Sequence, residues 1–118
     1  MNKIHFEEKL EKSLSLMKER NMWELNYAPP LYKRLWKKGY QIPPPPFASV
    51  WLNTLIFGMY FSIVWGGLLL ALLLLLDIFE VKIFLMYSFS AGILFGISMS
   101  IYHLWRRVVN QLPEWDDL

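Results

Sequence analysis

The sequence contains no cysteine, and this absence excludes several kinds of chemistry. Disulfides, thiolate metal sites, iron–sulfur clusters and cysteine nucleophiles all require the missing thiol. Charged residues are also scarce, since they make up 19% of the 118 residues, whereas hydrophobic residues make up 55%. Residues 48–76 contain no charged residue and no histidine. Such a segment cannot form a water-facing surface, so an ordinary soluble enzyme core is excluded.

Two long apolar runs predict two membrane-spanning helices. The first run, residues 48–76, is longer than a hydrocarbon core of about 30 Å requires, and the second, residues 83–105, fits with modest tilt. The loop between them, residues 77–82, carries three charges and is short enough to join only antiparallel neighbours. The predicted fold is therefore an all-α membrane protein built on a two-helix transmembrane hairpin, residues 48–105.

Residues 1–47 are expected to form two short amphipathic helices and a polyproline arm on the cytoplasmic side. The first helix has an apolar stripe at helical spacing. Its members are Phe6, Leu10, Leu14 and Met17. Pro43–Pro46 favours a stiff polyproline II segment leading into the first span. Residues 106–118 are expected to be a short cytoplasmic tail.

The distribution of basic residues predicts the orientation of the hairpin. Nine of the 12 basic residues precede the first span, and Arg106 and Arg107 follow the second, whereas the loop has only Lys82. Because basic residues concentrate on the cytoplasmic side, both termini should face the cytoplasm. Trp51 and Trp105 lie at the corresponding ends of the two spans, as expected for an aromatic belt on that side.

Residues 31–38 predict a helix that lies in the membrane interface. On a helical wheel, the apolar residues occupy one half and the basic residues the other. The apolar half is Leu31, Tyr32, Leu35 and Trp36, and the basic half is Lys33, Arg34, Lys37 and Lys38. Four cations near an anionic surface contribute on the order of 1 kcal/mol each. The aromatic half and the arm toward the bilayer favour lipid over nucleic acid as the partner.

The expected lipid contacts are thus Tyr32, Lys33, Arg34, Trp36, Lys37, Lys38, Trp51, Trp105, Arg106 and Arg107.

Small residues repeat at intervals of four in both spans and predict close helix packing. The set comprises Gly58, Ser62 and Gly66 in the first span and Ser88, Gly92, Gly96 and Ser100 in the second. Two compatible interpretations follow: these faces join the two helices of one chain, or at least one face packs against another chain.

No arrangement of residues indicates catalysis. The sequence has no nucleophile–base pair, phosphate-binding loop or paired carboxylates. His5 and His103 are far apart and have no carboxylate at ligand spacing. We therefore expect no catalytic residue, no cofactor and no metal.

Several short motifs carry a family resemblance. They are Asn26-Tyr27-Ala28-Pro29-Pro30-Leu31, Leu35-Trp36 with Gly39, Ile42-Pro43-Pro44-Pro45, Phe61 with Trp65-Gly66, and Leu112-Pro113-Glu114-Trp115. Over nearly the whole chain, these motifs resemble an uncharacterised family of small bacterial two-span inner-membrane proteins, a domain of unknown function. The resemblance implies a location in the bacterial inner (cytoplasmic) membrane and supplies no activity.

The leading functional hypothesis is a non-enzymatic inner-membrane protein that acts as an oligomeric scaffold or as an accessory subunit of a larger membrane complex. Its cytoplasmic helices would rest on anionic lipid and present a docking surface. The alternative is a pore-forming or membrane-permeabilising oligomer, such as a holin-like protein or a defence effector. A small-molecule carrier is a third reading, which the absence of a carboxylate within the spans disfavours.

Overall fold

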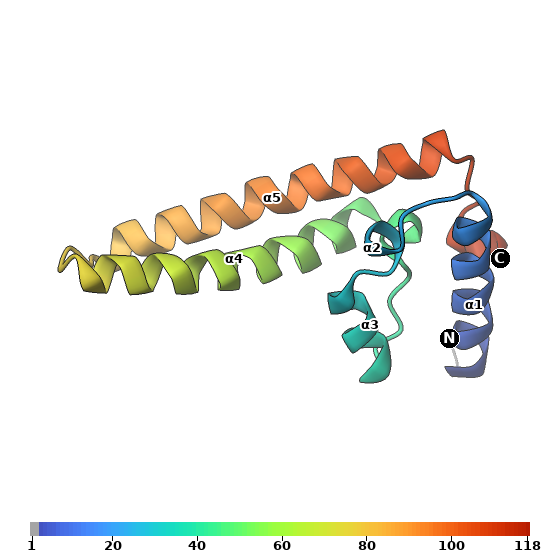
Figure 1. The fold of residues 1–118 in the computed structure, drawn as a ribbon, viewed down its shortest axis with the longest axis horizontal. Helices are drawn as coiled ribbons and strands as arrows, with labels where there is room; N and C mark the ends of the chain where they lie inside the picture. The colour runs from blue at the N-terminus through green and yellow to red at the C-terminus, as the bar shows by residue number, and fades with distance from the viewer. Residues whose placement is uncertain (1–2) are drawn as a thin grey trace. The chain divides into compact units, whose positions relative to one another are not determined.

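The computed structural model describes residues 3–118, and no strand occurs among these residues. Five α-helices and two short 3-10 helices follow one another along the chain (Figure 1). They are α1 (Lys3–Glu19), α2 (Glu24–Tyr27), α3 (Pro30–Lys37), η1 (Pro45–Phe47), α4 (Val50–Leu75), α5 (Val81–Val109) and η2 (Trp115–Asp117). The all-α prediction is confirmed, and the N-terminal region has one more helix, α2, than the two expected.

The chain forms two compact units, and the two ends of the chain share one of them. The polar unit combines the N-terminal residues up to Ser49 with Tyr102–Leu118, and the hairpin unit comprises Val50–Ile101. The sequence-based division treated residues 106–118 as a separate tail. In the structure this tail belongs to the polar unit, because its tryptophan packs among the N-terminal residues.

The core of the polar unit gathers side chains from distant parts of the sequence. Its buried members are Met17, Met22, Tyr27, Ala28 and Phe47. The indole of Trp115 lies against Phe6 and Phe47, with ring centroids 5.8 and 6.1 Å apart. Lys9 Nζ also donates to the carbonyl oxygen of Trp115 at 3.4 Å. The C-terminal tail thus closes the core that α1 begins.

The proline run is folded into this unit rather than extended from it. Pro44–Pro46 are fully buried, and the 3-10 helix η1 begins at Pro45. The amide of Phe47 donates to the carbonyl of Pro44 at 2.8 Å. The expected stiff polyproline II arm is therefore corrected: the end of the run forms a 3-10 turn that is packed within the polar unit. Proline's fixed φ suits the first turn of a helix, and its apolar ring is readily buried.

Four helices end in the same left-handed turn. The residues with positive φ are Asn21 after α1, Gly39 after α3, Asp77 after α4 and Gln111 after α5. In each case the next amide donates back across the turn, as Ile78 N does to Leu73 O at 3.0 Å. This Schellman pattern satisfies carbonyls that the helix end would leave free. It also lets α4 reverse into α5 within a few residues.

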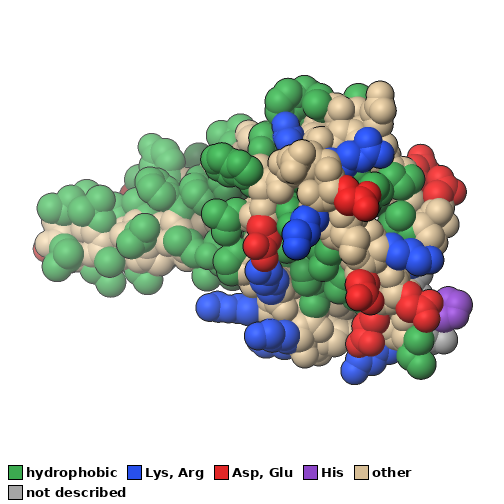
Figure 2. Space-filling model, turned by 45° about the vertical axis from the view of Figure 1, so that its right-hand side comes forward, with side chains coloured by type: hydrophobic (Ala, Val, Ile, Leu, Met, Phe, Trp, Pro, Cys, Tyr) green, Lys and Arg blue, Asp and Glu red, His purple; other side chains and the backbone are tan. Residues whose placement is uncertain are grey.

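The two long helices of the sequence-based prediction are confirmed as a packed helical hairpin. α4 spans Val50–Leu75, close to the expected 48–76. α5 spans Val81–Val109 and therefore continues past the expected end at residue 105 to include Arg106 and Arg107. Figure 2 shows hydrophobic side chains covering the hairpin, whereas charged side chains gather on the polar unit.

Candidate functional site

The two long helices approach each other most closely at glycines. A Cβ atom placed on Gly58 would lie 3.0 Å from the carbonyl oxygen of Gly92, and one on Gly96 would lie 2.5 Å from that of Thr54. A Cβ on Gly92 would overlap the hydroxyl of Ser62. No larger residue fits without moving the backbones apart. We call this line of contact the seam.

Hydroxyl groups join the helices along the seam. Thr54 Oγ1 and Ser100 Oγ lie 2.7 Å apart, and Ser100 Oγ also reaches the carbonyl of Val50 at 3.1 Å. Farther along, Ser62 Oγ donates to the carbonyl of Ser88 at 3.2 Å. Interhelical hydrogen bonds of this kind stabilise helix pairs where no water competes.

Ser88 completes the set of small residues at the seam. It is buried, and a Cβ on Gly66 would lie 3.2 Å from its hydroxyl oxygen. All seven small residues predicted for packing are therefore accounted for within one chain. This geometry agrees with the first of the two interpretations, in which the small residues join the two helices of one hairpin.

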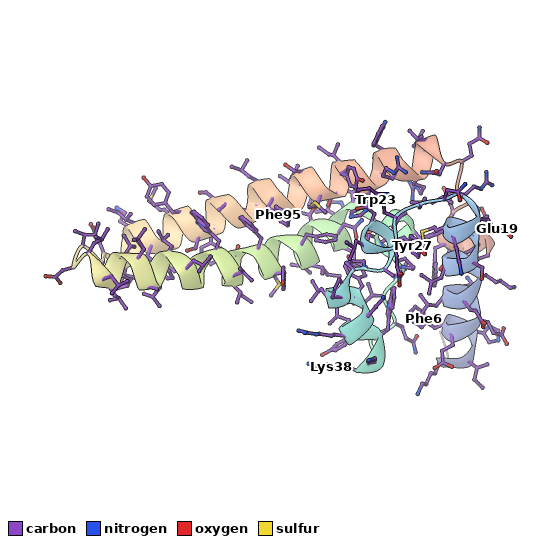
Figure 3. All side chains as sticks on the ribbon, viewed as in Figure 1. Phe6, Glu19, Trp23, Tyr27, Lys38 and Phe95 are labelled. Atoms are coloured by element: carbon purple, nitrogen blue, oxygen red, sulfur yellow. The ribbon has the colours of Figure 1, made fainter. Side chains whose placement is uncertain are left out.

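One side of the seam is filled by aromatic rings. Phe61 stacks on Phe95 with centroids 4.3 Å apart, and Phe57 meets Phe95 edge-on at 6.5 Å (Figure 3 labels Phe95). Phe61 also stacks on Trp65 at 6.3 Å. These rings cover the helix contact from that side.

The other side of the seam is an open groove. With Gly58 at 0° on the α4 wheel, Phe57 and Phe61 lie about 60–100° to one side, and Leu55 and Met59 lie about 60–100° to the other. Two adjoining hollows of about 320 and 280 Å³ run along this second side. Their walls are Leu55, Met59, Ile63, Leu70, Phe84, Phe89 and Ile93, and Gly58, Ser62, Gly66 and Gly92 form the floor. Because Ser62, Ile63 and Phe89 line both hollows, we treat them as one groove.

The basic helix of the polar unit differs from its expected arrangement. Tyr32 is fully buried, and Trp36 is half-buried against the core with its indole Nε1 donating to the carbonyl of Ile42 at 2.7 Å. Burial raises the pKa of the Tyr32 phenol. The expectation that Tyr32 contacts lipid is therefore corrected, because its side chain is buried inside the protein, whereas Trp36 keeps part of its ring exposed.

The basic half of α3 is exposed, as the wheel predicted. Arg34, Lys37 and Lys38 point to the surface, and Lys33 Nζ forms an ion pair with Glu24 at 2.7 Å. The hydrogen bond from Lys33, supported by its charge, lowers the pKa of the Glu24 carboxyl. These cations therefore remain on the surface, with one of them partly neutralised.

The other predicted interface residues lie at helix ends. Trp51 near the start of α4 is 84% exposed, and Trp105 on α5 is 54% exposed. The guanidinium of Arg106 lies over the Trp105 ring, 5.5 Å from its centroid. Arg106 and Arg107 are both half-buried. A tryptophan beside a cation at a helix end is typical of a membrane interface.

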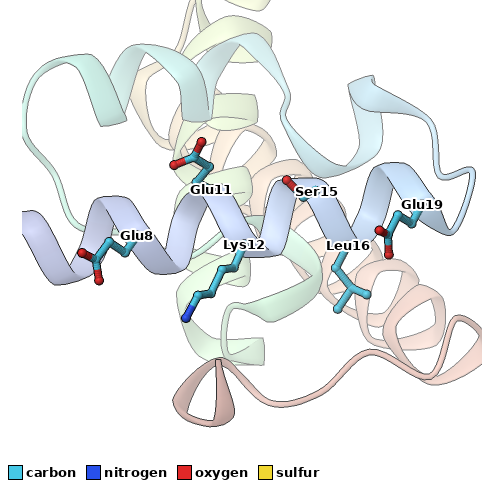
Figure 4. A pocket seen from close by; sticks show the side chains of 6 residues that line it. All are labelled: Glu8, Glu11, Lys12, Ser15, Leu16 and Glu19. Carbon is cyan, nitrogen blue, oxygen red and sulfur yellow. The ribbon is translucent and has the colours of Figure 1, made fainter.

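The outer face of α1 carries a shallow hollow with charges of both signs (Figure 4). The side chains of Glu8, Glu11, Lys12 and Glu19 line it. Mixed charges of this kind are typical of a solvent-exposed helix. Among residues 3–118, no group of three or more His, Cys, Asp or Glu residues is placed to hold a metal ion.

The comparison with known protein families identifies a family to which the chain is similar. The model of DUF6404, described as a family of unknown function, matches residues 4–118. The chain belongs to this family. The DUF6404 match includes the hairpin and the polar unit, and it confirms that the motifs belong to a family of unknown function. The chain matches no curated protein and no solved structure.

Sequence reasoning missed two features of the DUF6404 chain. Trp115 was noted only as part of a motif, although it closes the core of the polar unit. Trp23, which precedes α2, and Leu25, which lies in it, are 75% and 68% exposed. The sequence analysis assigned neither residue a role. The signal for both was an aromatic residue inside an otherwise polar segment.

Proposed function

We propose that this chain is a non-enzymatic integral membrane protein whose helices α4 and α5 cross the bacterial inner membrane, with both termini in the cytoplasm. One observation carries the proposal. Of the most apolar 18 residues of each helix, only 11% are buried in α4 and 22% in α5. A core helix of a soluble protein would be mostly buried, whereas in water this exposed apolar area would cost about 25 cal/mol per Å². Lipid removes that cost.

The positions of the cations support contact between the polar unit and anionic headgroups. Arg34, Lys37 and Lys38 are exposed, and Arg106 and Arg107 follow the apolar part of α5. Each cation near an anionic surface contributes about 1 kcal/mol. The proposed partners are therefore the anionic lipids of the cytoplasmic leaflet.

We further propose that the chain is a scaffold or accessory subunit, assembled with copies of itself or within a larger membrane complex. The seam contacts already join the two helices of one hairpin, so a partner helix would pack beside the seam and not replace it. The groove beside the seam supports such a contact, because its apolar walls flank a floor of small residues that lets another helix approach closely. The hydroxyls of Thr54, Ser62 and Ser100 bond within the hairpin, which disfavours a pore lined by them.

Native mass spectrometry of the complex extracted in mild detergent tests this assembly. We expect a homogeneous multiple of 14.1 kDa or co-purification with larger membrane proteins. Met59→Trp fills the groove and should release single chains. Val64→Trp, at an exposed position that does not line the groove, is the matched control. A single chain from the wild-type protein, or equal assembly of both variants, would count against the groove as the contact.

A further inference from the structure

The exposed pair Trp23 and Leu25 lies between residues that are anchored in the polar unit. Met22 before it and Tyr27 after it are buried in the core, 6% and 8% exposed. Between them, Glu24 is paired with Lys33, and the amide of Asn26 donates to the phenol of Tyr102 at 2.7 Å. Figure 3 labels Trp23 and Tyr27 at α2. Two large apolar side chains are thus exposed on a segment whose neighbouring residues contact the rest of the unit.

The hydrogen bond to Tyr102 ties α2 to a particular part of α5. Tyr102 precedes Trp105 by one turn, and their ring centroids are 6.2 Å apart. If α5 crosses a membrane, as proposed above, this part of the helix leaves the apolar run and enters the headgroup region. Residues fixed to Tyr102 therefore lie near the same depth.

We propose that Trp23 and Leu25 form an interfacial wedge, inserted where the lipid headgroups meet the acyl chains. This inference rests on the proposed membrane insertion of the hairpin, and it gives the N-terminal region apolar lipid contacts in place of the buried Tyr32.

The chemistry of the pair fits the lipid interface. An indole has a large apolar body and one polar N–H, and tryptophan is accordingly enriched at this boundary. Trp105 and Val108 at the end of α5 are also exposed, 54% and 67%, and Arg106 supplies a cation for lipid phosphate. The wedge and the end of α5 thus expose residue types suited to the same boundary within one unit.

The absence of cysteine makes a direct test possible, because single spin labels can be placed at chosen positions of the full chain. Leu25→Cys reports on the wedge, Leu68→Cys on the middle of α4, and Ser15→Cys on the exposed face of α1. The labelled proteins are reconstituted in vesicles of phosphatidylethanolamine and phosphatidylglycerol. Power saturation then compares collisions with oxygen, which is concentrated in lipid, with collisions with a water-soluble nickel chelate.

We expect the oxygen-to-nickel ratio at Leu25→Cys to exceed that at Ser15→Cys several-fold and to lie below the ratio at Leu68→Cys, as a position at the interface requires. Trp23→Cys should behave as Leu25→Cys does, which guards against a local effect of one label. If the nickel chelate reaches Leu25→Cys as readily as Ser15→Cys while Leu68→Cys lies in lipid, the wedge proposal is overturned and the membrane insertion of the hairpin is not. A wedge label shielded from both reagents would show that protein covers it and would also overturn the lipid assignment. Nickel access at Leu68→Cys would instead overturn the membrane insertion of the hairpin.

Discussion

Replacing Gly96 with alanine should weaken the hairpin, and Gly67 provides a matched control. The added Cβ at Gly96 would lie 2.5 Å from the Thr54 carbonyl oxygen and 3.1 Å from the Gly58 Cα, and both atoms belong to the backbone and cannot rotate away. At Gly67 the same atom would meet nothing within 4 Å. Both changes gain the same helix propensity, about 1 kcal/mol, so the difference between the two variants reports on packing.

The magnitude follows from the distance that the helices must separate. Ordinary contact begins at 3.4 Å, so α4 and α5 must part by about 0.9 Å at Gly96. A gap of about 0.5–1 Å forfeits a quarter to a half of each dispersion contact along that stretch. It also stretches the 2.7 Å bond between Thr54 and Ser100, a kind of bond that contributes about 0.6 kcal/mol or more in membranes. Overpacking of this degree costs about 1–3 kcal/mol in total.

The assay is unfolding of the purified protein in mixed micelles, titrated with sodium dodecyl sulfate and followed by circular dichroism. Gly96→Ala should unfold at lower detergent fraction than Gly67→Ala, with a free-energy difference of about 1–3 kcal/mol. Equal stability of the two variants would refute the claim that the seam depends on glycine.

Three further predictions concern the polar unit, each measured by unfolding of the full chain in mild detergent. Trp115→Ala should cost about 2–4 kcal/mol because it empties the contact with Phe6 and Phe47, whereas Tyr40→Ala, at a 56% exposed position, should have little effect; similar losses would contradict the role of the tail. Gln111→Gly should stabilise by about 1 kcal/mol because its φ of 53° strains any side chain, and Asn110→Gly, one residue earlier, should destabilise; the opposite order would argue against the turn. The lowered pKa of Glu24 means that its pairing with Lys33 stabilises the fold above pH 4.5 and is lost as the pH falls through the lowered pKa; Glu24→Gln should reduce the acid sensitivity slightly, and an unchanged pH profile would show that the pair contributes nothing.

The hairpin could be predicted from the sequence because its signal is local and strong. A run without charges, such as residues 48–76, has few stable forms other than a membrane helix. The fourfold spacing of Gly58 and Ser62 likewise placed them on one helix face. The sequence left open which helix that face meets. Packing against a second helix of the same chain and against a helix of another chain require the same fourfold spacing of small residues.

The polar unit was harder to predict, because an amphipathic pattern does not say what covers its apolar half. In α3 the separation of Tyr32 and Trp36 from the lysines suits a membrane surface and a protein core equally well. The structure buries Tyr32 and packs Trp36 against a core that Phe47 and Trp115, from distant parts of the chain, help to complete. Such long-range contacts leave no local trace in the sequence.

The most direct test of the central claim, that α4 and α5 cross the bilayer with both termini in the cytoplasm, is the labelling of single cysteines in bacterial spheroplasts. Ile78→Cys lies in the loop between the helices, and Ser15→Cys lies on the exposed face of α1. We predict that a membrane-impermeant maleimide labels Ile78→Cys from outside and labels Ser15→Cys only after the membrane is permeabilised. Equal labelling of both positions before permeabilisation, or labelling of Ser15→Cys alone, would contradict the account.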